Sequence, residues 1–340
     1  MNRLFKKNLK KCIKKSFILF SFLCISLTGC SKAKVQKSVA VFVPGIIADS
    51  PIYSKMVDGV KSAAEKFNLT KTENEKVSVF IFEAGTNQAE WSSQLTALCA
   101  EAKYDCIISS NPSLPELTEP LTKQFPSQKF ILLDAMKDGN PNIVTVRYKQ
   151  DEAAFISGYA AGLMSKSKKI GLITAQEYPV MNEIILPNFE KGLRAADVYE
   201  KVDFRIVGNW YDAKKGAELA DAMSTSGVDV ILPICGGASQ GVITSAKEHQ
   251  TMLCWFDSNS YSSAPGLVIS CVSSLQEKLA EEMTLKYFND QIEWGTFSEL
   301  GMKDGYVKLV DDDELYINTV PEEIRKKINA EIENIMKSSE

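Results

Sequence analysis

The sequence predicts an α/β protein of two lobes, each built on a doubly wound parallel sheet. Short apolar runs alternate with amphipathic helical stretches, and this alternation occurs in two successive sets along the chain. The composition agrees, because 45% hydrophobic and 24% charged residues among 340 supply enough apolar surface for folded domains. A chain of this length has room for about two domains.

The elements follow from the position of each apolar run. The first set has expected strands at 39–43, 77–82, 105–109, 129–134 and 143–146, with helices near 51–67, 88–102 and 114–124. The second set has expected strands at 169–174, 203–207, 228–234, 252–256 and 267–271, with helices near 151–165, 180–196, 213–225 and 238–249. Two further helices are expected near 275–289 and 321–337.

The first thirty residues have the pattern of an export signal. Seven basic residues and no acidic ones precede an apolar stretch at 16–27, which is shorter than the roughly 20 residues that a spanning helix needs. Leu27-Thr28-Gly29-Cys30 then resembles a bacterial lipobox. We expect a signal peptide over 1–29, acyl chains such as palmitate on Cys30, and a spacer over 30–38. The body would then be anchored to a membrane on its extracytoplasmic side.

Charge and residue usage argue against several functions. Loss of the signal peptide takes the formal net charge from −4 to −11, which disfavours nucleic-acid binding. The single histidine, His249, rules out a multi-histidine metal site, and we expect no metal or cofactor. Ser239 stands in a G-x-S-x-G pattern typical of a nucleophile elbow. His249 falls in the same predicted helix and cannot fold back onto it, so we expect no enzymatic activity.

Candidate ligand residues follow the predicted strands, where doubly wound sheets bind their ligands. Asp257 offers a carboxylate that can accept two hydrogen bonds from adjacent hydroxyls, and Trp210 offers a stacking surface. Gly237 allows close backbone approach, and Asp49 precedes a helix whose start attracts polar groups. Three of them have a structural alternative: a half-buried ring for Trp210, a tight turn for Gly237 and a helix cap for Asp49.

Several segments in order resemble the basic membrane protein family of bacterial substrate-binding lipoproteins, which includes purine nucleoside receptors. The resemblance is carried by 146–147, 155–162 (FISGYAAG), 169–172, 189–192, 212–216, 229–231, 236–237, 256–258, 264–266 and 301–305 (GMKDG). It implies a type I periplasmic-binding-protein fold with lobes at 39–148 plus 272–300 and 149–271 plus 301–340, joined by a hinge. It also implies a small-molecule ligand in the cleft, with an ABC permease and ATPase as partners.

The resemblance also implies roles for individual residues. Asp257 falls on the acid that binds ribose hydroxyls, Trp210 on an aromatic that stacks on the base, and Gly237 near a backbone contact. Asp134 falls on a further polar contact. A purine nucleoside is therefore the favoured ligand.

The chain departs from the family pattern where the base would bind. Val43 replaces an acid and Ile52 replaces a phenylalanine, for which Tyr53 is a candidate substitute. Ser273 stands where the family has a lysine. These changes leave open a modified nucleoside or a sugar as ligand. A sensor or adhesion lipoprotein without a transport role is a further alternative.

Overall fold

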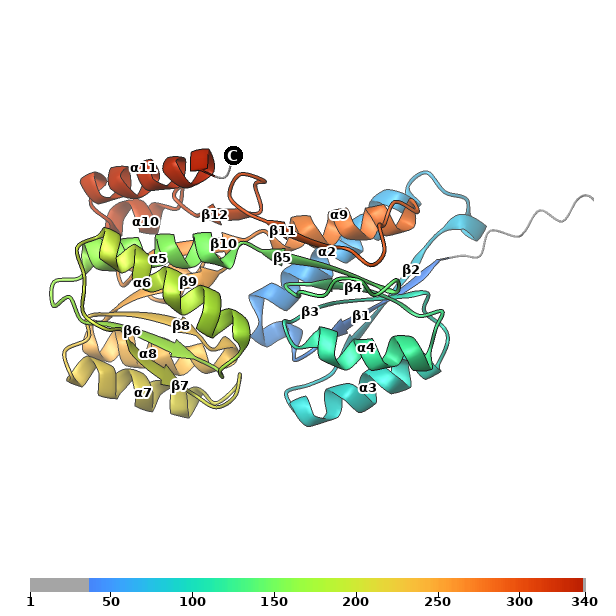
Figure 1. The fold of residues 1–340 in the computed structure, drawn as a ribbon, viewed down its shortest axis with the longest axis horizontal. Coiled ribbons are helices and arrows are strands. Elements are labelled where there is room, and N and C mark those ends of the chain that lie inside the picture. Colours follow the sequence, from blue (N-terminus) through green and yellow to red (C-terminus); the bar gives the residue numbers. More distant parts are fainter. Residues whose placement is uncertain (1–36, 339–340) are drawn as a thin grey trace, which may run out of the picture.

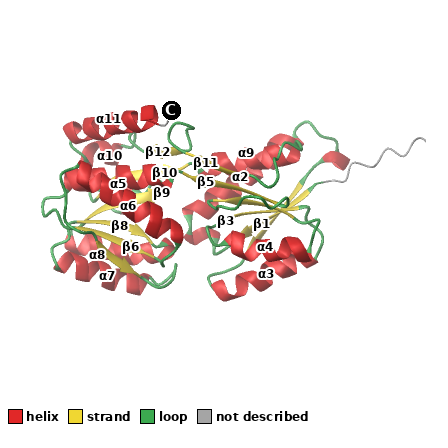
Figure 2. Ribbon diagram, viewed as in Figure 1, coloured by secondary structure: helices red, strands yellow, loops and turns green. Residues whose placement is uncertain are grey.

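The computed structural model describes residues 37–338, so the expected signal peptide, Cys30 and most of the spacer lie outside it. Two lobes lie side by side, each a six-stranded sheet between layers of helices (Figures 1 and 2). This is the two-lobe α/β architecture that the sequence predicts.

The first lobe has a fully parallel sheet in the order β11-β5-β4-β3-β1-β2. Its strands are β1 (Ser38–Val43), β2 (Ser78–Glu83), β3 (Cys106–Ser110), β4 (Lys129–Leu133), β5 (Ile143–Tyr148) and β11 (Phe297–Leu300). Its helices are α2 (Pro51–Asn68), α3 (Gln88–Ala100), α4 (Leu114–Gln124) and α9 (Gln276–Phe288). The pair α2 and α9 covers one face, and α3 and α4 cover the other.

The second lobe has the order β12-β10-β9-β8-β6-β7, in which β12 alone among the described strands runs antiparallel to its neighbour. Its strands are β6 (Ile170–Thr174), β7 (Asp203–Ile206), β8 (Val230–Ile234), β9 (Met252–Asp257), β10 (Val268–Ser274) and β12 (Val307–Leu309). Its helices are α5 (Gln150–Met164), α6 (Leu186–Ala195), α7 (Ala213–Thr225), α8 (Ser239–His249), α10 (Glu314–Thr319) and α11 (Glu322–Ser338). The C-terminal α11 packs on α5 (Figure 1).

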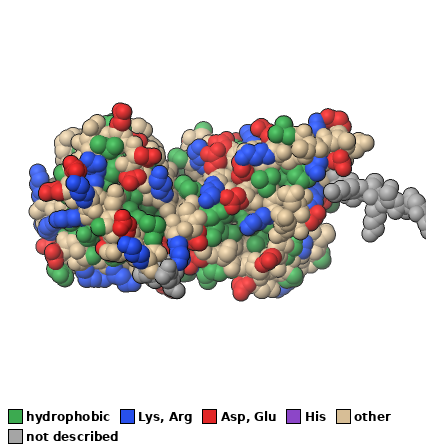
Figure 3. Space-filling view, turned by 90° about the horizontal axis from the view of Figure 1, so that it is seen from above, with side chains coloured by type: hydrophobic (Ala, Val, Ile, Leu, Met, Phe, Trp, Pro, Cys, Tyr) green, Lys and Arg blue, Asp and Glu red, His purple; other side chains and the backbone are tan. Residues whose placement is uncertain are grey.

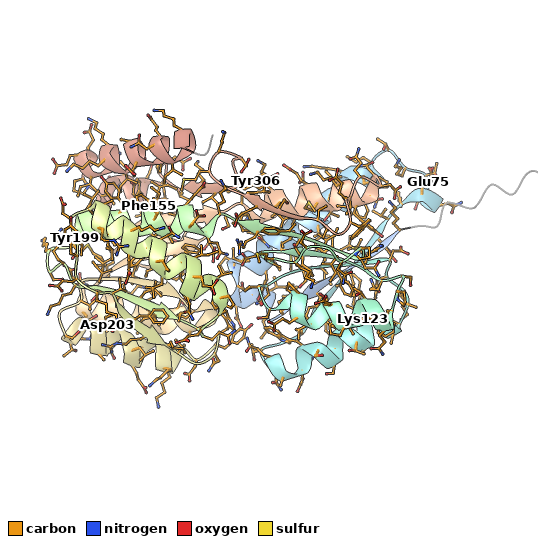
Figure 4. All side chains as sticks on the ribbon, in the orientation of Figure 1. Glu75, Lys123, Phe155, Tyr199, Asp203 and Tyr306 are labelled. Carbon is orange, nitrogen blue, oxygen red and sulfur yellow. The ribbon has the colours of Figure 1, made fainter. Side chains whose placement is uncertain are left out.

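The chain crosses between the lobes three times, after β5, after β10 and after β11. Hydrogen bonds join the crossings to one another. The Tyr148 hydroxyl donates to Gln276 Oε1 at 2.7 Å, and the Lys149 amide donates to the Leu300 carbonyl at 2.9 Å. The Leu275 amide donates to the carbonyl of Tyr306 at 2.8 Å, and Figure 4 shows Tyr306 between the lobes. The three crossings therefore form one hinge.

The structure adds elements that the sequence pattern did not predict. These are two short strands, β11 and β12, and the six-residue α10, for which the sequence analysis assigned no element. Half of the β11 side chains are exposed, and β12 has only three residues, so neither shows a clear hydrophobic period. The helix expected from 180 begins as a π-helical turn at Met181–Ile185 before α6. β10 runs to Ser274, so the second crossing begins three residues later than expected.

Positive and negative side chains are interspersed over the face seen in Figure 3, without a broad basic area among the residues described there. No helix between residues 37 and 338 combines the length and apolar character needed to cross a bilayer.

Close helix crossings in the second lobe depend on glycine. A Cβ on Gly158 of α5 would lie 2.1 Å from the Phe189 carbonyl oxygen of α6. A Cβ on Gly192 of α6 would lie 2.0 Å from the Phe155 carbonyl oxygen of α5. Both contacts are with backbone, which cannot move aside as a flexible side chain can, so the two helices lie closer than any larger residue permits.

We therefore expect Gly192→Ala to force α5 and α6 apart and to lower the free energy of unfolding by about 1–3 kcal/mol. Denaturant unfolding measures this change. The neighbouring exposed substitution Lys191→Ala serves as the control and should change stability by less than about 0.5 kcal/mol. Equal effects of the two substitutions would contradict the close crossing.

Candidate functional site

A cavity of about 210 Å³ lies between the lobes and is lined by residues of both. The lining residues stand at the carboxyl ends of strands, as expected for doubly wound sheets. From the first lobe come the start of α2, residues 110–112 after β3, and Asp134 after β4. From the second lobe come Tyr178 after β6, Trp210 after β7, and the chain after β8 and β9.

The seven ligand residues expected from the sequence do not all reach this cavity. Six of them line it: Asp49, Tyr53, Asp134, Trp210, Gly237 and Asp257. Ser273 instead lines an adjoining cavity of about 450 Å³, which shares Asp257 and Ser258 with the first. Ser273 lies within β10 with its Oγ buried and without a hydrogen-bond partner. A contact from Ser273 to a ligand therefore needs the ligand to extend into the adjoining cavity.

Asp134 and Asp257 approach the cavity from opposite lobes. Asp134 follows β4 in the first lobe, and Asp257 ends β9 in the second. Both have left-handed backbone, with φ of 50° and 72°, a conformation that aspartate tolerates better than most residues. Gln150 Nε2 donates to Asp134 Oδ1 at 2.6 Å, and Ser274 Oγ donates to Asp257 Oδ1 at 3.3 Å.

Both carboxyls bind protons more tightly than ordinary aspartates. Burial raises the pKa of each, because the charged form loses contact with water. The negative charge of Asp257 raises the pKa of Asp134 further, whereas the hydrogen bond from Gln150 lowers it. The two groups are therefore close enough for the ionisation of one to oppose that of the other.

Aromatic rings form another part of the wall. The rings of Tyr178 and Trp210 lie 6.2 Å apart at an angle of 47°. Trp210 packs against Gly236, where a Cβ would lie 3.3 Å from its ring. The indole Nε1 of Trp210 is buried without a hydrogen-bond partner. A buried indole N–H normally has an acceptor, so this donor is available to a ligand.

The first lobe contributes the start of α2. Ser50 caps this helix by accepting a hydrogen bond from the Tyr53 amide at 3.4 Å, and Pro51 occupies the first helical position. This cap confirms the expected helix start and brings Tyr53 to the cavity. Asn111 Nδ2 donates to the Tyr53 hydroxyl at 3.3 Å, which fixes the direction of the ring.

One contact joins the lobes near the cavity. The Tyr211 hydroxyl of the second lobe donates to the Pro44 carbonyl of the first at 3.1 Å. Gly45 leaves room for this contact, because a Cβ there would lie 2.5 Å from Tyr211 Oη. Closure of the lobes therefore includes a hydrogen bond that needs no ligand.

The hydrolase alternative finds no support in the geometry. Ser239 Oγ lies 3.2 Å from Cys235 Sγ, whereas His249 pairs with Asp221 at 3.3 Å. Ser239 and His249 are the two ends of α8, about 15 Å apart at the helical rise per residue. Among residues 37–338, no group of three or more histidine, cysteine or acidic side chains is arranged to hold a metal ion.

Sequence reasoning missed Gln150 and Tyr178 as individual site residues, and it missed Asn111 as the partner of Tyr53. Gln150 begins α5 directly after the first crossing, and its Oε1 is buried without a partner. The strand expected at 143–146 ends before β5 does at Tyr148, so residue 150 did not stand among the residues that directly follow an expected strand. Tyr178 and Asn111 follow expected strands, but nothing in their local pattern distinguished them from their neighbours.

Comparisons with known proteins agree with this architecture. The sequence model of the Bmp family, described as ABC transporter substrate-binding protein PnrA-like, matches residues 36–338. A solved structure, an ABC transporter solute-binding protein from Aeropyrum pernix, superposes with a TM-score of 0.78 at 18% identity over 89% of this chain and 92% of that one. This likeness confirms the predicted fold.

Curated relatives include two whose names match this family and one named otherwise. Basic membrane protein A2 of Borrelia garinii is 24% identical over 93% of this chain and 92% of its own length. The ABC transporter nucleoside-binding protein BmpA of Lactococcus lactis is 31% identical over 42% of this chain and 41% of its own length. The CD4+ T-cell-stimulating antigen of Listeria monocytogenes is 28% identical over 47% and 44%. The chain thus matches less than half the length of the last two.

The acid pair makes stability depend on pH. A carboxyl whose pKa rises on folding holds more protons in the folded than in the unfolded state. The free energy of unfolding then falls as pH rises from about 4 through the raised pKa. Asp134→Asn removes the titrating carboxyl and with it this pH-dependent loss of stability. Asparagine also tolerates the left-handed backbone at this position. We expect the ligand-free variant to be more stable than the wild type at pH 8 by more than about 1.4 kcal/mol, the free energy that corresponds to one pKa unit.

Thermal or urea unfolding from pH 4 to pH 9 measures the difference. At pH 4 the folded-state carboxyls are protonated and those of the unfolded state are about half protonated, so the advantage of the variant should nearly disappear at that end of the range. Asp197→Asn is the matched control, because Asp197 is exposed and also has left-handed backbone. A stability difference between Asp134→Asn and wild type that does not change with pH would contradict the interpretation.

Proposed function

This chain belongs to the Bmp family of PnrA-like ABC transporter substrate-binding proteins, and we propose that it binds a nucleoside between its lobes, with a purine nucleoside favoured. Members of this family bind a substrate for a transporter and are not enzymes, in agreement with the expectation from the sequence. What we propose beyond the family is the nucleoside ligand and a lipid anchor on Cys30.

One observation carries the nucleoside proposal: a carboxylate and aromatic rings line the same cavity. Asp257 can accept hydrogen bonds from vicinal ribose hydroxyls, and hydrogen bonds to a charged acceptor are stronger than neutral ones. The faces of Trp210 and Tyr178 can pack against a planar base. The similarity to a relative named as a nucleoside-binding protein supports the same ligand class.

The hinge supports a role in delivery. Residues of both lobes line the cavity, so a ligand bound there would contact both lobes and favour the arrangement in which they are close together. A permease and its ATPase can then distinguish the loaded receptor by its shape. We propose these as the partners, with acyl chains on Cys30 holding the protein at the extracytoplasmic face of the membrane.

Ligand binding can be tested by thermal unfolding of the full chain in detergent, after refolding to remove any bound ligand. The panel contains inosine, guanosine, adenosine, pyrimidine nucleosides, free bases and pentoses. A ligand at 100 times its Kd stabilises by about 2.7 kcal/mol, which raises Tm by several degrees. We expect purine nucleosides to give the largest increase, and no increase from any nucleoside would contradict the proposal.

Asp257→Asn tests the role of the carboxylate without disturbing its left-handed backbone. Loss of a hydrogen bond to a charged group costs about 1.5–3 kcal/mol, so nucleoside affinity should fall roughly 10- to 150-fold. Isothermal titration measures the change. Asp197→Asn, an equivalent change on the surface, should leave affinity unaltered.

The anchor has a separate test. Cys30→Ala removes the thiol that would carry the acyl chains, so the protein should lose incorporation of radiolabelled palmitate and leave the membrane fraction. Cys24→Ala, within the expected signal peptide, is the matched control and should change neither property. A Cys30→Ala protein that stays with the membrane and incorporates label would contradict the anchor.

A further inference from the structure

The main cavity is lined by acidic side chains and by no basic ones among the described residues. Asp49, Asp134 and Asp257 line it, and no lysine or arginine is among the described residues that do so. Asp49 is exposed at one side of the cavity, whereas Asp134 and Asp257 are half-buried. Buried carboxylates in proteins are normally paired with a cation or fully hydrogen-bonded. Each of these two receives a single side-chain hydrogen bond, from Gln150 and Ser274 respectively.

Basic side chains around the pair and in the adjoining cavity already have partners. Arg147 lowers the pKa of Asp134 only weakly, and its guanidinium donates twice to Glu299 Oε1, at 2.9 and 2.6 Å. In the adjoining cavity Lys55 pairs with Glu277 at 2.7 Å. Lys278, also in that cavity, lies 4.1 Å from the centre of the Tyr306 ring and donates to the Gly305 carbonyl.

Aromatic rings stand close to the same acids. Tyr53 and Tyr178 line the cavity, and burial together with the charge of Asp134 raises the pKa of both phenols. Both phenols therefore stay neutral at physiological pH. Carboxylates beside neutral aromatic rings are the combination that binds organic cations, through ion pairs and attraction to the ring face.

We propose that the ligand carries a positively charged amine, held between Asp134 and Asp257. This deepens the proposed function and rests on it, since the cation would be part of a nucleoside-like molecule. The charge would join the two lobes, because each carboxylate belongs to a different one. A phosphorylated ligand is disfavoured by the same three acids. The alternative is that one of the two carboxyls, Asp134 or Asp257, keeps a proton, in which case the cavity would suit a neutral ligand.

A charge series at one molecular shape tests the proposal. The probes are adenosine, 5′-amino-5′-deoxyadenosine, 3′-amino-3′-deoxyadenosine and adenosine 5′-monophosphate, with the guanosine equivalents in parallel. Tyramine and its neutral counterpart tyrosol are added as an aromatic pair without a sugar. Binding to the full chain in detergent is measured by isothermal titration at pH 7.

We expect at least one amino nucleoside to bind at least tenfold more tightly than its neutral parent, and the monophosphate not to bind. In Asp134→Asn this preference should fall at least tenfold, while affinity for the neutral parent changes less. Asp197→Asn, the matched surface change, should keep the wild-type preference. The ratio between charged and neutral probes does not depend on the overall stability of a variant.

The outcomes separate the two proposals. If neutral nucleosides bind as well as or better than every amine, the positive charge is refuted and the nucleoside function stands. If no nucleoside binds but tyramine binds and tyrosol does not, the nucleoside function fails and the cation site stands. If the monophosphate binds as well as its parent, or if no probe binds, the cation proposal is overturned.

Discussion

The three crossings of the chain hold the carboxyl ends of two parallel sheets face to face, and the rest of the site depends on that constraint. A parallel sheet places all of its strand-to-helix loops at one edge. Two such edges that meet across a hinge enclose a cavity without any dedicated binding domain. The hydrogen bonds that join the crossings, from Tyr148 to Gln276 and from Lys149 to Leu300, fix which loops oppose each other.

The left-handed backbone of Asp134 and Asp257 shows how the sheets contribute to the chemistry. Each residue sits where a strand stops, and the turn in the backbone directs the chain away from the sheet. Burial then gives each carboxyl an unusual affinity for protons, because solvent no longer stabilises its charge. The electrostatic character of the cavity thus follows from two strand ends and the polar residues Gln150 and Ser274 behind them.

Local pattern was enough to predict both lobes and four residues that line the cavity, and the family resemblance added Tyr53 and Asp134. The buried strands are continuous apolar runs, and a parallel sheet dictates where their ends meet. Three features were beyond its reach for physical reasons. β12 has only three residues, Gln150 reaches the cavity through a crossing, and Ser273 lines an adjoining cavity with its Oγ buried. All three depend on how the lobes are joined, which no window of sequence contains.

The contact between Tyr211 and Pro44 has a consequence for how the receptor can diversify. Its acceptor is a main-chain carbonyl, and its neighbour Gly45 has no side chain. This hydrogen bond therefore does not depend on which side chains occupy the positions around Pro44 and Gly45. Side chains that line the cavity can therefore change without removing this contact, so the same hinge can accept different ligands as long as Tyr211 and Gly45 are kept.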